Sequence, residues 1–148
     1  NTYMEFLSLF ITIAGFIIGL GAVTVIDLHG FLARKSSYWT EATIRTHKVT
    51  KPLIWIGILL VALGTFLAGT NEFLSSGEFA IRLVIIFLMI LNGSFLSFVI
   101  SPELLRREKD GRAGELLPHT MQNKIILSFL VSVILWWGLL AYIVLGLI

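Results

Sequence analysis

The stretch FLSLFITIAGFIIGLGAVTVI, residues 6–26, decides the fold of this chain. Glu5 and Asp27 bound it, and it contains no charged residue. A helix needs about 20 apolar residues to cross roughly 30 Å of hydrocarbon, and this stretch has that length. Lipid offers backbone N–H and C=O groups no hydrogen-bond partner, so a crossing segment must be helical. Basic residues follow the stretch rather than precede it, so we expect a transmembrane helix and not a cleaved signal peptide.

Three more charge-free stretches of similar length follow along the chain. Hydrophobic residues make up 57% of the sequence and charged residues 14%, whereas a soluble domain has about 25% charged residues. A transmembrane barrel would instead show alternating segments of about ten residues. We therefore predict an all-α fold, an integral membrane four-helix bundle that forms a single domain. The predicted spans are about 4–26, 52–71, 79–101 and 123–146.

The basic residues predict the orientation of the bundle. Of the 11 Lys and Arg residues, all but Arg82 fall in the segments 27–51 and 103–124. Loops rich in Lys and Arg stay in the cytoplasm. We therefore predict cytoplasmic loops at 27–51 and 102–122, with both termini outside, in a bacterial-type inner membrane or a plasma membrane. The sequence starts at Asn1 rather than Met, as expected if a few residues are missing or were removed.

Net charge and cysteine content limit which partners the chain can bind and which kinds of site it can contain. A net charge of +2 and a pI of about 9.2 would be compatible with nucleic-acid binding. The basic residues lie in loops between apolar stretches, however, so we expect anionic lipid at the cytoplasmic loops and no nucleic acid. The chain has no cysteine, which excludes disulfides, thiolate zinc sites and cysteine nucleophiles.

The two halves of the chain are alike. Residues 25–35 align with residues 99–109, and each segment ends an out-to-in helix in basic residues. Further on, one histidine precedes Lys51 and another precedes Lys124, each just before a returning helix. We predict two tandem helical hairpins, related as parallel repeats by an axis along the membrane normal.

Local patterns predict where individual helices begin. Ser75 with Glu78 forms a capping box at the start of the third span, and Glu78 and Arg82 have the i, i+4 spacing of an ion pair. The triplet 101–103, Ser-Pro-Glu, predicts an N-cap, so that the third span ends or kinks and a short cytoplasmic helix runs to about Asp110.

A second cytoplasmic helix is expected ahead of the second span. It would lie at the membrane interface over residues 38–51, with Glu41 and Arg45 paired at i, i+4.

Small residues predict how the helices pack. Lipid competes for apolar side chains, so membrane helices associate through residues that let their backbones approach closely. We expect a bundle with close crossings; homodimerisation through the GxxxG motif of the first helix, or a larger membrane complex, is the alternative. The predicted packing residues are Gly15, Gly19, Gly57, Gly64, Gly93, Ser128 and Ser132.

Few polar residues are candidates for a site at membrane depth. No residue charged at pH 7 lies in the central part of a predicted span, although ion pathways and proton relays normally contain one; Glu5, Arg82 and Lys124 lie near span ends. Asn92 is expected to hydrogen-bond a neighbouring helix or, alternatively, to contact a ligand. Arg82 is expected to reach the head groups or pair with Glu78, or else to bind an anion such as a cofactor propionate.

The three histidines are candidates for a metal site. His29, His47 and His119 all fall on the predicted cytoplasmic side, where Asp27 and Glu103 could join them. Histidines and carboxylates together can hold a metal ion. The favoured interpretation, however, is that they are ordinary polar residues of interfacial loops, since no HxxxH or HExxH spacing occurs.

Two short segments resemble a known group of membrane proteins. Val-Thr-Lys-Pro at 49–52 and Ile-Arg-Leu at 81–83 are similar to motifs of the HemJ-type protoporphyrinogen oxidases and the CopD-type copper-resistance proteins. The resemblance implies a bundle that binds haem or handles a porphyrin. That group has a haem-ligating histidine within its first helix, whereas here no histidine precedes His29; its lysine corresponds to Arg82.

Three functions are compatible with these patterns. The favoured one is a non-catalytic membrane protein, a subunit, scaffold or binding module, because the sequence shows no nucleophile arrangement, phosphate loop or metal-ligand spacing. The second is a haem- or porphyrin-linked membrane oxidoreductase, which rests on the resemblance. The third is a small dimeric transporter or channel that uses the interface between the repeats.

Overall fold

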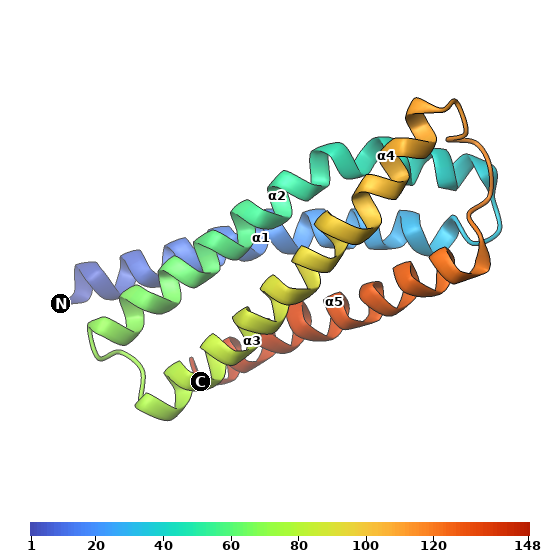
Figure 1. Ribbon diagram of the computed structural model, residues 1–148. Coiled ribbons are helices and arrows are strands. Elements are labelled where there is room, and N and C mark those ends of the chain that lie inside the picture. Colours follow the sequence, from blue (N-terminus) through green and yellow to red (C-terminus); the bar gives the residue numbers. More distant parts are fainter.

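A computed structural model describes residues 1–148, and all of its regular structure is helical. Both termini lie at the end of the molecule where α2 connects to α3, and α4 lies at the other end (Figure 1). Four helical runs, counting α3, η1 and α4 as one, are long and apolar enough to cross a membrane. The elements are α1 Thr2–Leu32, α2 Ser37–Thr70, α3 Ser76–Phe95, the π-helix η1 Leu96–Ile100, α4 Ser101–Lys109 and α5 His119–Leu145.

The helices extend well beyond the apolar stretches that predicted them. α1 has 31 residues and α2 has 34; at about 1.5 Å per residue each is longer than roughly 30 Å of hydrocarbon. The segment 27–51, predicted as a loop, is helical except at residues 33–36. The separate helix expected at 38–51 is instead the first part of α2, which continues through Pro52. A charged residue ends an apolar stretch but does not end a helix, which explains why α1 and α2 are longer than the predicted spans. The predicted cytoplasmic position of 27–51 is compatible with this helical structure.

The third span continues through a π-helix into α4 instead of stopping at a cap. Ser101 has helical dihedral angles, φ −59° and ψ −44°, so it is not the predicted N-cap. Pro102 has no N–H to continue the helical hydrogen bonds, and a π-turn accommodates such a defect. The predicted short helix is present as α4, which ends at Lys109. Gly111 follows with φ +75°, a conformation that favours glycine.

Glycines set the distance between α1 and α2. A Cβ atom added to Gly57 would lie 2.4 Å from the Cα atom of Gly19, and one added to Gly15 would lie 2.9 Å from the carbonyl oxygen of Gly57. Further along, a Cβ atom on Gly64 would lie 2.0 Å from Oγ1 of Thr12. The GxxxG face of α1 is therefore covered by α2 of the same chain.

Two apolar clusters hold the bundle together. In the larger one, the ring of Trp136 packs edge-on against Phe16, with ring centroids 6.0 Å apart. The smaller one joins α2, η1, α4 and the 110–118 connection at the other end. The larger cluster comprises Phe16, Leu20, Val23, Ile58, Val61, Ile86, Met89, Trp136, Leu139 and Ile143. The smaller comprises Ile44, Ile100, Leu104 and Leu117.

Polar side chains join the helices where the backbones are further apart. The Asn92 amide donates to the carbonyl oxygen of Ser128 at 3.3 Å, and the Ser128 hydroxyl donates to Oδ1 of Asn92 at 2.7 Å. Asn92 thus hydrogen-bonds a neighbouring helix, as the sequence predicted. Trp55 Nε1 donates to the hydroxyl oxygen of Ser97 at 3.0 Å. Gly93 leaves room for the same Trp55 ring, which a Cβ atom there would approach to 3.3 Å.

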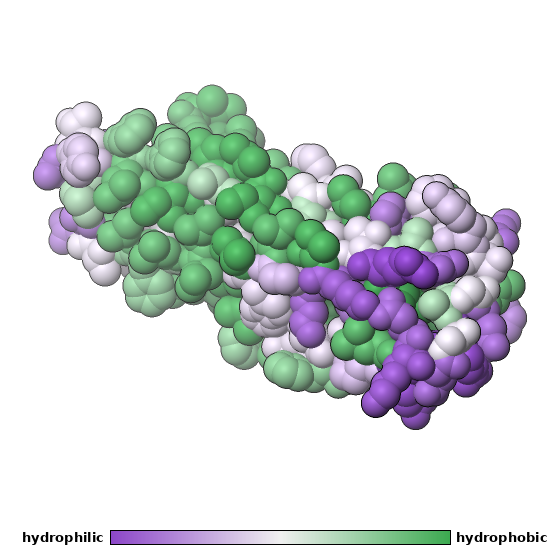
Figure 2. Space-filling view, turned by 90° about the horizontal axis from the view of Figure 1, so that it is seen from above, coloured by the Kyte–Doolittle hydropathy of each residue, from purple (hydrophilic) through white to green (hydrophobic).

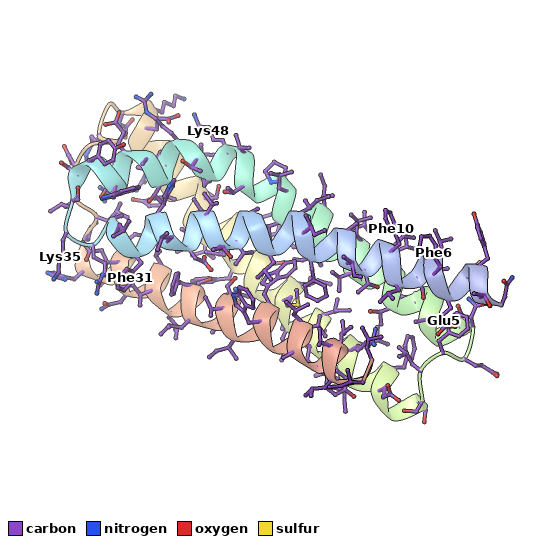
Figure 3. All side chains as sticks on the ribbon, turned by 180° about the vertical axis from the view of Figure 1, so that it is seen from behind. Glu5, Phe6, Phe10, Phe31, Lys35 and Lys48 are labelled. Atoms are coloured by element: carbon purple, nitrogen blue, oxygen red, sulfur yellow. The ribbon has the colours of Figure 1, made fainter.

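The surface divides into an apolar body and a hydrophilic end. Hydrophobic residues cover most of the face in Figure 2, and hydrophilic residues gather at one end. Phe6 and Phe10 project outward from α1, whereas Lys35 and Lys48 lie at the far end (Figure 3). Large apolar side chains are strongly exposed, including Ile17 at 71% and Phe98 at 77%. Such continuous apolar surface is typical of contact with a lipid bilayer. We call the end that contains α4 the basic end.

Candidate functional site

A cavity lies among the helices at the basic end. Counted as the space open to the centre of a water molecule, its volume is about 80 Å³. One water needs roughly 10–15 Å³ on this measure, so the cavity has room for several waters or a small organic group. Its wall is mostly apolar, and α1, α2, α5 and the α3–η1–α4 run all contribute to it. The polar residues in the wall are Asp27, Thr43, His47, Thr50, Lys51, Ser97 and Ser101.

Asp27 is the most unusual group in this wall. Its side chain, on α1, is only 9% exposed, and Oδ2 is buried without a hydrogen-bond partner. Ser132 on α5 lies near this carboxylate. Lys51 lines the same cavity, yet no ion pair joins the two side chains. A buried carboxylate oxygen is unfavourable unless it is protonated or accepts a hydrogen bond, so this atom is available to a ligand.

Asp27 also borders a second, smaller cavity of about 20 Å³. Asn92, Ser132 and Trp136 line that cavity with it, so it leads from the basic end toward the larger apolar cluster. Asp27 therefore borders both spaces, as Ile54, Gly93 and Leu96 also do. Asn92 is part of this wall, although its amide is already occupied by Ser128.

The sequence placed Asp27 outside the first span and so missed its role. Residues 16, 20, 23 and 27 share one face of an α-helix, and the first three are buried core residues. Extending that face by one turn would have predicted a buried Asp27. The predicted span was instead ended at the first charged residue. The burial of Asp27, the one acidic side chain that the bundle encloses, was therefore not predicted.

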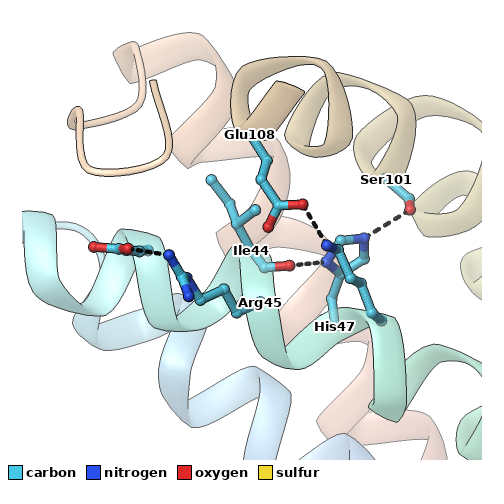
Figure 4. A network of polar contacts seen from close by, with 7 residues as sticks. Ile44, Arg45, His47, Ser101 and Glu108 are labelled. Atoms are coloured by element: carbon cyan, nitrogen blue, oxygen red, sulfur yellow. Dashed lines mark hydrogen bonds and ion pairs between the residues drawn. The ribbon is translucent and has the colours of Figure 1, made fainter. Parts of the chain in front are cut away.

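His47 and Ser101 form a hydrogen-bonded pair across α2 and α4 (Figure 4). Nδ1 of His47 contacts the carbonyl oxygen of Ile44, which can only accept, so Nδ1 carries a hydrogen. In the neutral ring Nε2 then accepts, and the Ser101 hydroxyl donates to it at 3.0 Å. The group that orients the histidine is a backbone carbonyl rather than a carboxylate. Both side chains are buried, at 7% and 3% exposure, so the pair fastens α4 to α2.

Two ion pairs lie on α2 and α4 at the basic end. Lys48 on α2 pairs with Glu108 on α4, beside His47 (Figure 4). The hydrogen bond from Lys48 lowers the pKa of the Glu108 carboxyl. The predicted pair of Glu41 and Arg45 is present at 2.8 Å, and both side chains are exposed. Together with the His47–Ser101 bond, the Lys48–Glu108 pair keeps α4 over one side of the cavity.

The histidine and carboxylate cluster considered as a metal-site candidate at this end is not assembled. No three His, Asp or Glu side chains lie close enough to hold a metal ion. The His29 ring packs on Trp39, with centroids 5.2 Å apart, and only His47 faces the cavity. His119 is exposed at the start of α5, and Glu103 pairs with arginines of its own helix. The three histidines lie on α1, α2 and α5, on helix faces that do not meet. Their spacing in the sequence did not predict this.

Arg82 lies at the opposite end from the cavity. It is 8% exposed, and Nε is buried without a partner. The predicted ion pair with Glu78 is absent, because the Glu78 carboxylate accepts from the Ser75 hydroxyl at 3.0 Å instead. Ser75 also accepts from the backbone N–H of Glu78 at 3.2 Å, so the predicted cap of α3 is present. Arg82 therefore belongs to no site shared with the histidines.

No protein-family model, curated protein or solved structure matches this chain. The resemblance to the HemJ and CopD groups therefore stays a prediction. Its two motifs lie far apart: Thr50 and Lys51 line the cavity, whereas Arg82 lies at the other end of the molecule.

Proposed function

We propose that this chain is a multi-pass membrane protein that acts as a non-catalytic ligand-binding module. Four apolar helices support the membrane setting, and the concentration of Lys and Arg at one end supports a cytoplasmic position for that end. Both termini then face outside. Anionic lipids would contact the basic end, each nearby Lys or Arg contributing about 1 kcal/mol.

The ligand is a small, largely apolar molecule that carries an ammonium group or another strong hydrogen-bond donor. The buried, unpartnered Oδ2 of Asp27 is the observation that carries this proposal. Ligand sites are usually apolar cavities with a few convergent polar groups, and a carboxylate selects for a cation or a donor. Ile54, Trp55 and Phe129 line the same cavity and supply its apolar wall.

The other polar groups of the wall limit how a ligand can bind. Thr43 and Thr50 donate to backbone carbonyls of α2 at 2.7 and 3.2 Å, so their hydroxyls offer only lone pairs. Ser97 accepts from Trp55, which leaves its hydroxyl hydrogen free to donate. A ligand with its donor at Asp27 could therefore place an acceptor at Ser97.

The tandem repeat stays a prediction, and one feature of the cavity supports it. The alignment of residues 25–35 with 99–109 pairs Asp27 with Ser101, and both residues line the cavity. A ligand site between two related hairpins is typical of membrane proteins built from repeats. A small transporter is for this reason the second candidate function, since a buried carboxylate that borders two spaces suits a substrate pathway.

A titration with matched ligands tests the proposal. Butylammonium and butanol have similar apolar groups, but only the first carries a charge. In nanodiscs, calorimetry should show butylammonium binding that Asp27→Asn weakens by at least about tenfold, the effect of losing one charge-assisted hydrogen bond. Asp110→Asn, on the exposed connection after α4, is the matched control and should bind like the parent protein. Equal binding by the parent protein and Asp27→Asn would rule out Asp27 as the site.

A further inference from the structure

Arg82 is a second buried charge without a counter-ion, at the end of the molecule opposite the cavity. The ion pairs of the chain involve Arg45, Lys48, Arg106, Arg107 and Arg112, but not Arg82. No hydrogen bond within the chain satisfies its buried Nε. A buried guanidinium N–H that donates to nothing is unfavourable unless an acceptor compensates it. The chain therefore provides no counter-ion for Arg82, and a group from outside the chain is needed to compensate this positive charge.

The ionisable neighbours of Arg82 do not fill this role. Glu78 and Tyr142 are the two that lie near enough to influence it. The Glu78 carboxylate is held by the Ser75 hydroxyl at the start of α3, and its other oxygen points toward Gly146. The Tyr142 hydroxyl, on α5, can donate a hydrogen bond to an anion bound beside Arg82.

The first turn of α3 provides further hydrogen-bond donors, and the Arg82 side chain extends toward that turn. Side chains on an α-helix lean toward its N-terminus, so the guanidinium extends toward the first turn. There Ser75 satisfies the N–H groups of Glu78 and Phe79, whereas those of Ser76 and Gly77 have no partner within the chain. A Cβ atom on Gly77 would meet nothing within 4 Å, so the space beside it is open.

We propose that Arg82 and the first turn of α3 bind a phosphate group. A guanidinium matches phosphate oxygens with two parallel hydrogen bonds, and a helix N-terminus adds free N–H groups and a favourable dipole. The charge-free apolar stretch of α3 begins directly after Arg82, which places the site at the depth of lipid head groups. The phosphate can come from a phospholipid of the outer leaflet or from free phosphate. Because the site shares no residue with the cavity, it is independent of the ligand proposed for Asp27.

Lipid binding to the full chain tests this site. Native mass spectrometry should show phosphatidylglycerol bound to the parent protein, whereas diacylglycerol with the same acyl chains, which lacks the phosphate, should not be retained. Arg82→Gln should weaken binding of one phosphatidylglycerol by about tenfold or more, as expected for a charge-assisted bidentate contact. Arg82→Lys should keep part of the affinity. Arg45→Ala, an exposed arginine at the basic end, is the control and should leave this lipid in place.

A second arm distinguishes the two sources of phosphate. If inorganic phosphate alone binds, and Arg82→Gln abolishes that binding while lipid has no effect, the site takes free phosphate and the proposal holds. Equal retention of phosphatidylglycerol by Arg82→Gln and the parent protein, without binding of inorganic phosphate, would overturn it. Should Arg82→Gln fail to fold, Arg82→Lys takes its place: it should retain less phosphatidylglycerol than the parent protein, and equal retention without binding of inorganic phosphate would contradict the proposal.

Discussion

The crossing of α1 with α2 and the cavity at the basic end are built by the same two helices but packed in opposite ways. At the crossing, Gly15, Gly19 and Gly57 bring the backbones together and leave no space for a side chain. Nearer the basic end, Asp27 on α1 and His47 on α2 face a space that neither fills. One region stabilises the bundle, whereas the other keeps a polar site inside it.

The largest expected effect comes from filling the crossing. Gly57→Leu places a side chain 2.4 Å from the Cα atom of Gly19, and backbone cannot yield as a flexible side chain can. We expect a loss of roughly 3 kcal/mol or more, seen as aggregation in size-exclusion chromatography and a lower melting temperature in detergent. Gly138→Ala is the control, because nothing lies within 4 Å of the added atom. If Gly57→Leu were as stable as the parent protein, the crossing would not be the tight region.

A substitution in the cavity wall should change the stability of the bundle in the opposite direction. Asp27→Leu replaces a buried carboxylate whose Oδ2 is unsatisfied with an apolar side chain of similar size. We expect the variant to be as stable as the parent protein or more stable by about 1–3 kcal/mol, because an unpaired polar group is removed. Butylammonium binding should be lost at the same time. Thermal unfolding and calorimetry measure the two effects, and a marked loss of stability would show that Asp27 is a structural residue instead.

The hydrogen bond between His47 and Ser101 tests whether α4 is fastened to α2. Replacing either residue with alanine, and then both, gives a double-mutant cycle. We expect a coupling of about 1 kcal/mol, the usual net value of a buried hydrogen bond. The cycle is measured by thermal unfolding, and a coupling near zero would mean that α4 is held by Leu104 and the smaller apolar cluster alone.

The smallest effect is expected at the exposed ion pair of Lys48 and Glu108. The pKa of Glu108 is lower in the folded protein than in the unfolded chain, so the pair stabilises the fold at neutral pH. This contribution is lost as the pH falls through the lowered pKa. Glu108→Gln should therefore melt slightly below the parent protein at pH 7, and the difference should vanish in strong acid and shrink in high salt. A difference that persists in acid would contradict this account of the pair.

Sequence patterns predicted the apolar parts of the structure well. Absence of charge over about 20 residues indicates a membrane-spanning helix whatever its neighbours are, because hydrocarbon imposes one requirement on every helix that crosses it. The glycines of α1 and α2 followed from the same reasoning, since helices in lipid approach closely only where side chains are small.

The site was harder to predict, because it depends on which helix faces meet. Asp27 comes one residue after an apolar stretch, and only its position on the buried face of α1 shows that it is enclosed. His47 and Ser101 are 54 residues apart, and the π-helix before Ser101 turns its hydroxyl toward α2. No spacing along the chain encodes that contact.

Cysteine labelling of the cavity tests the central claim most directly, and the chain has no cysteine of its own. Thr50→Cys places a thiol in the cavity wall, and Val25→Cys places one on the exposed surface of α1 as a control. In oriented vesicles, we predict that a small membrane-impermeant thiol reagent reaches position 50 only from the basic end. Butylammonium should slow that reaction, and the protection should disappear when Asp27→Asn is added. Labelling of position 50 from the opposite side, or at a rate that butylammonium does not change, would contradict the account.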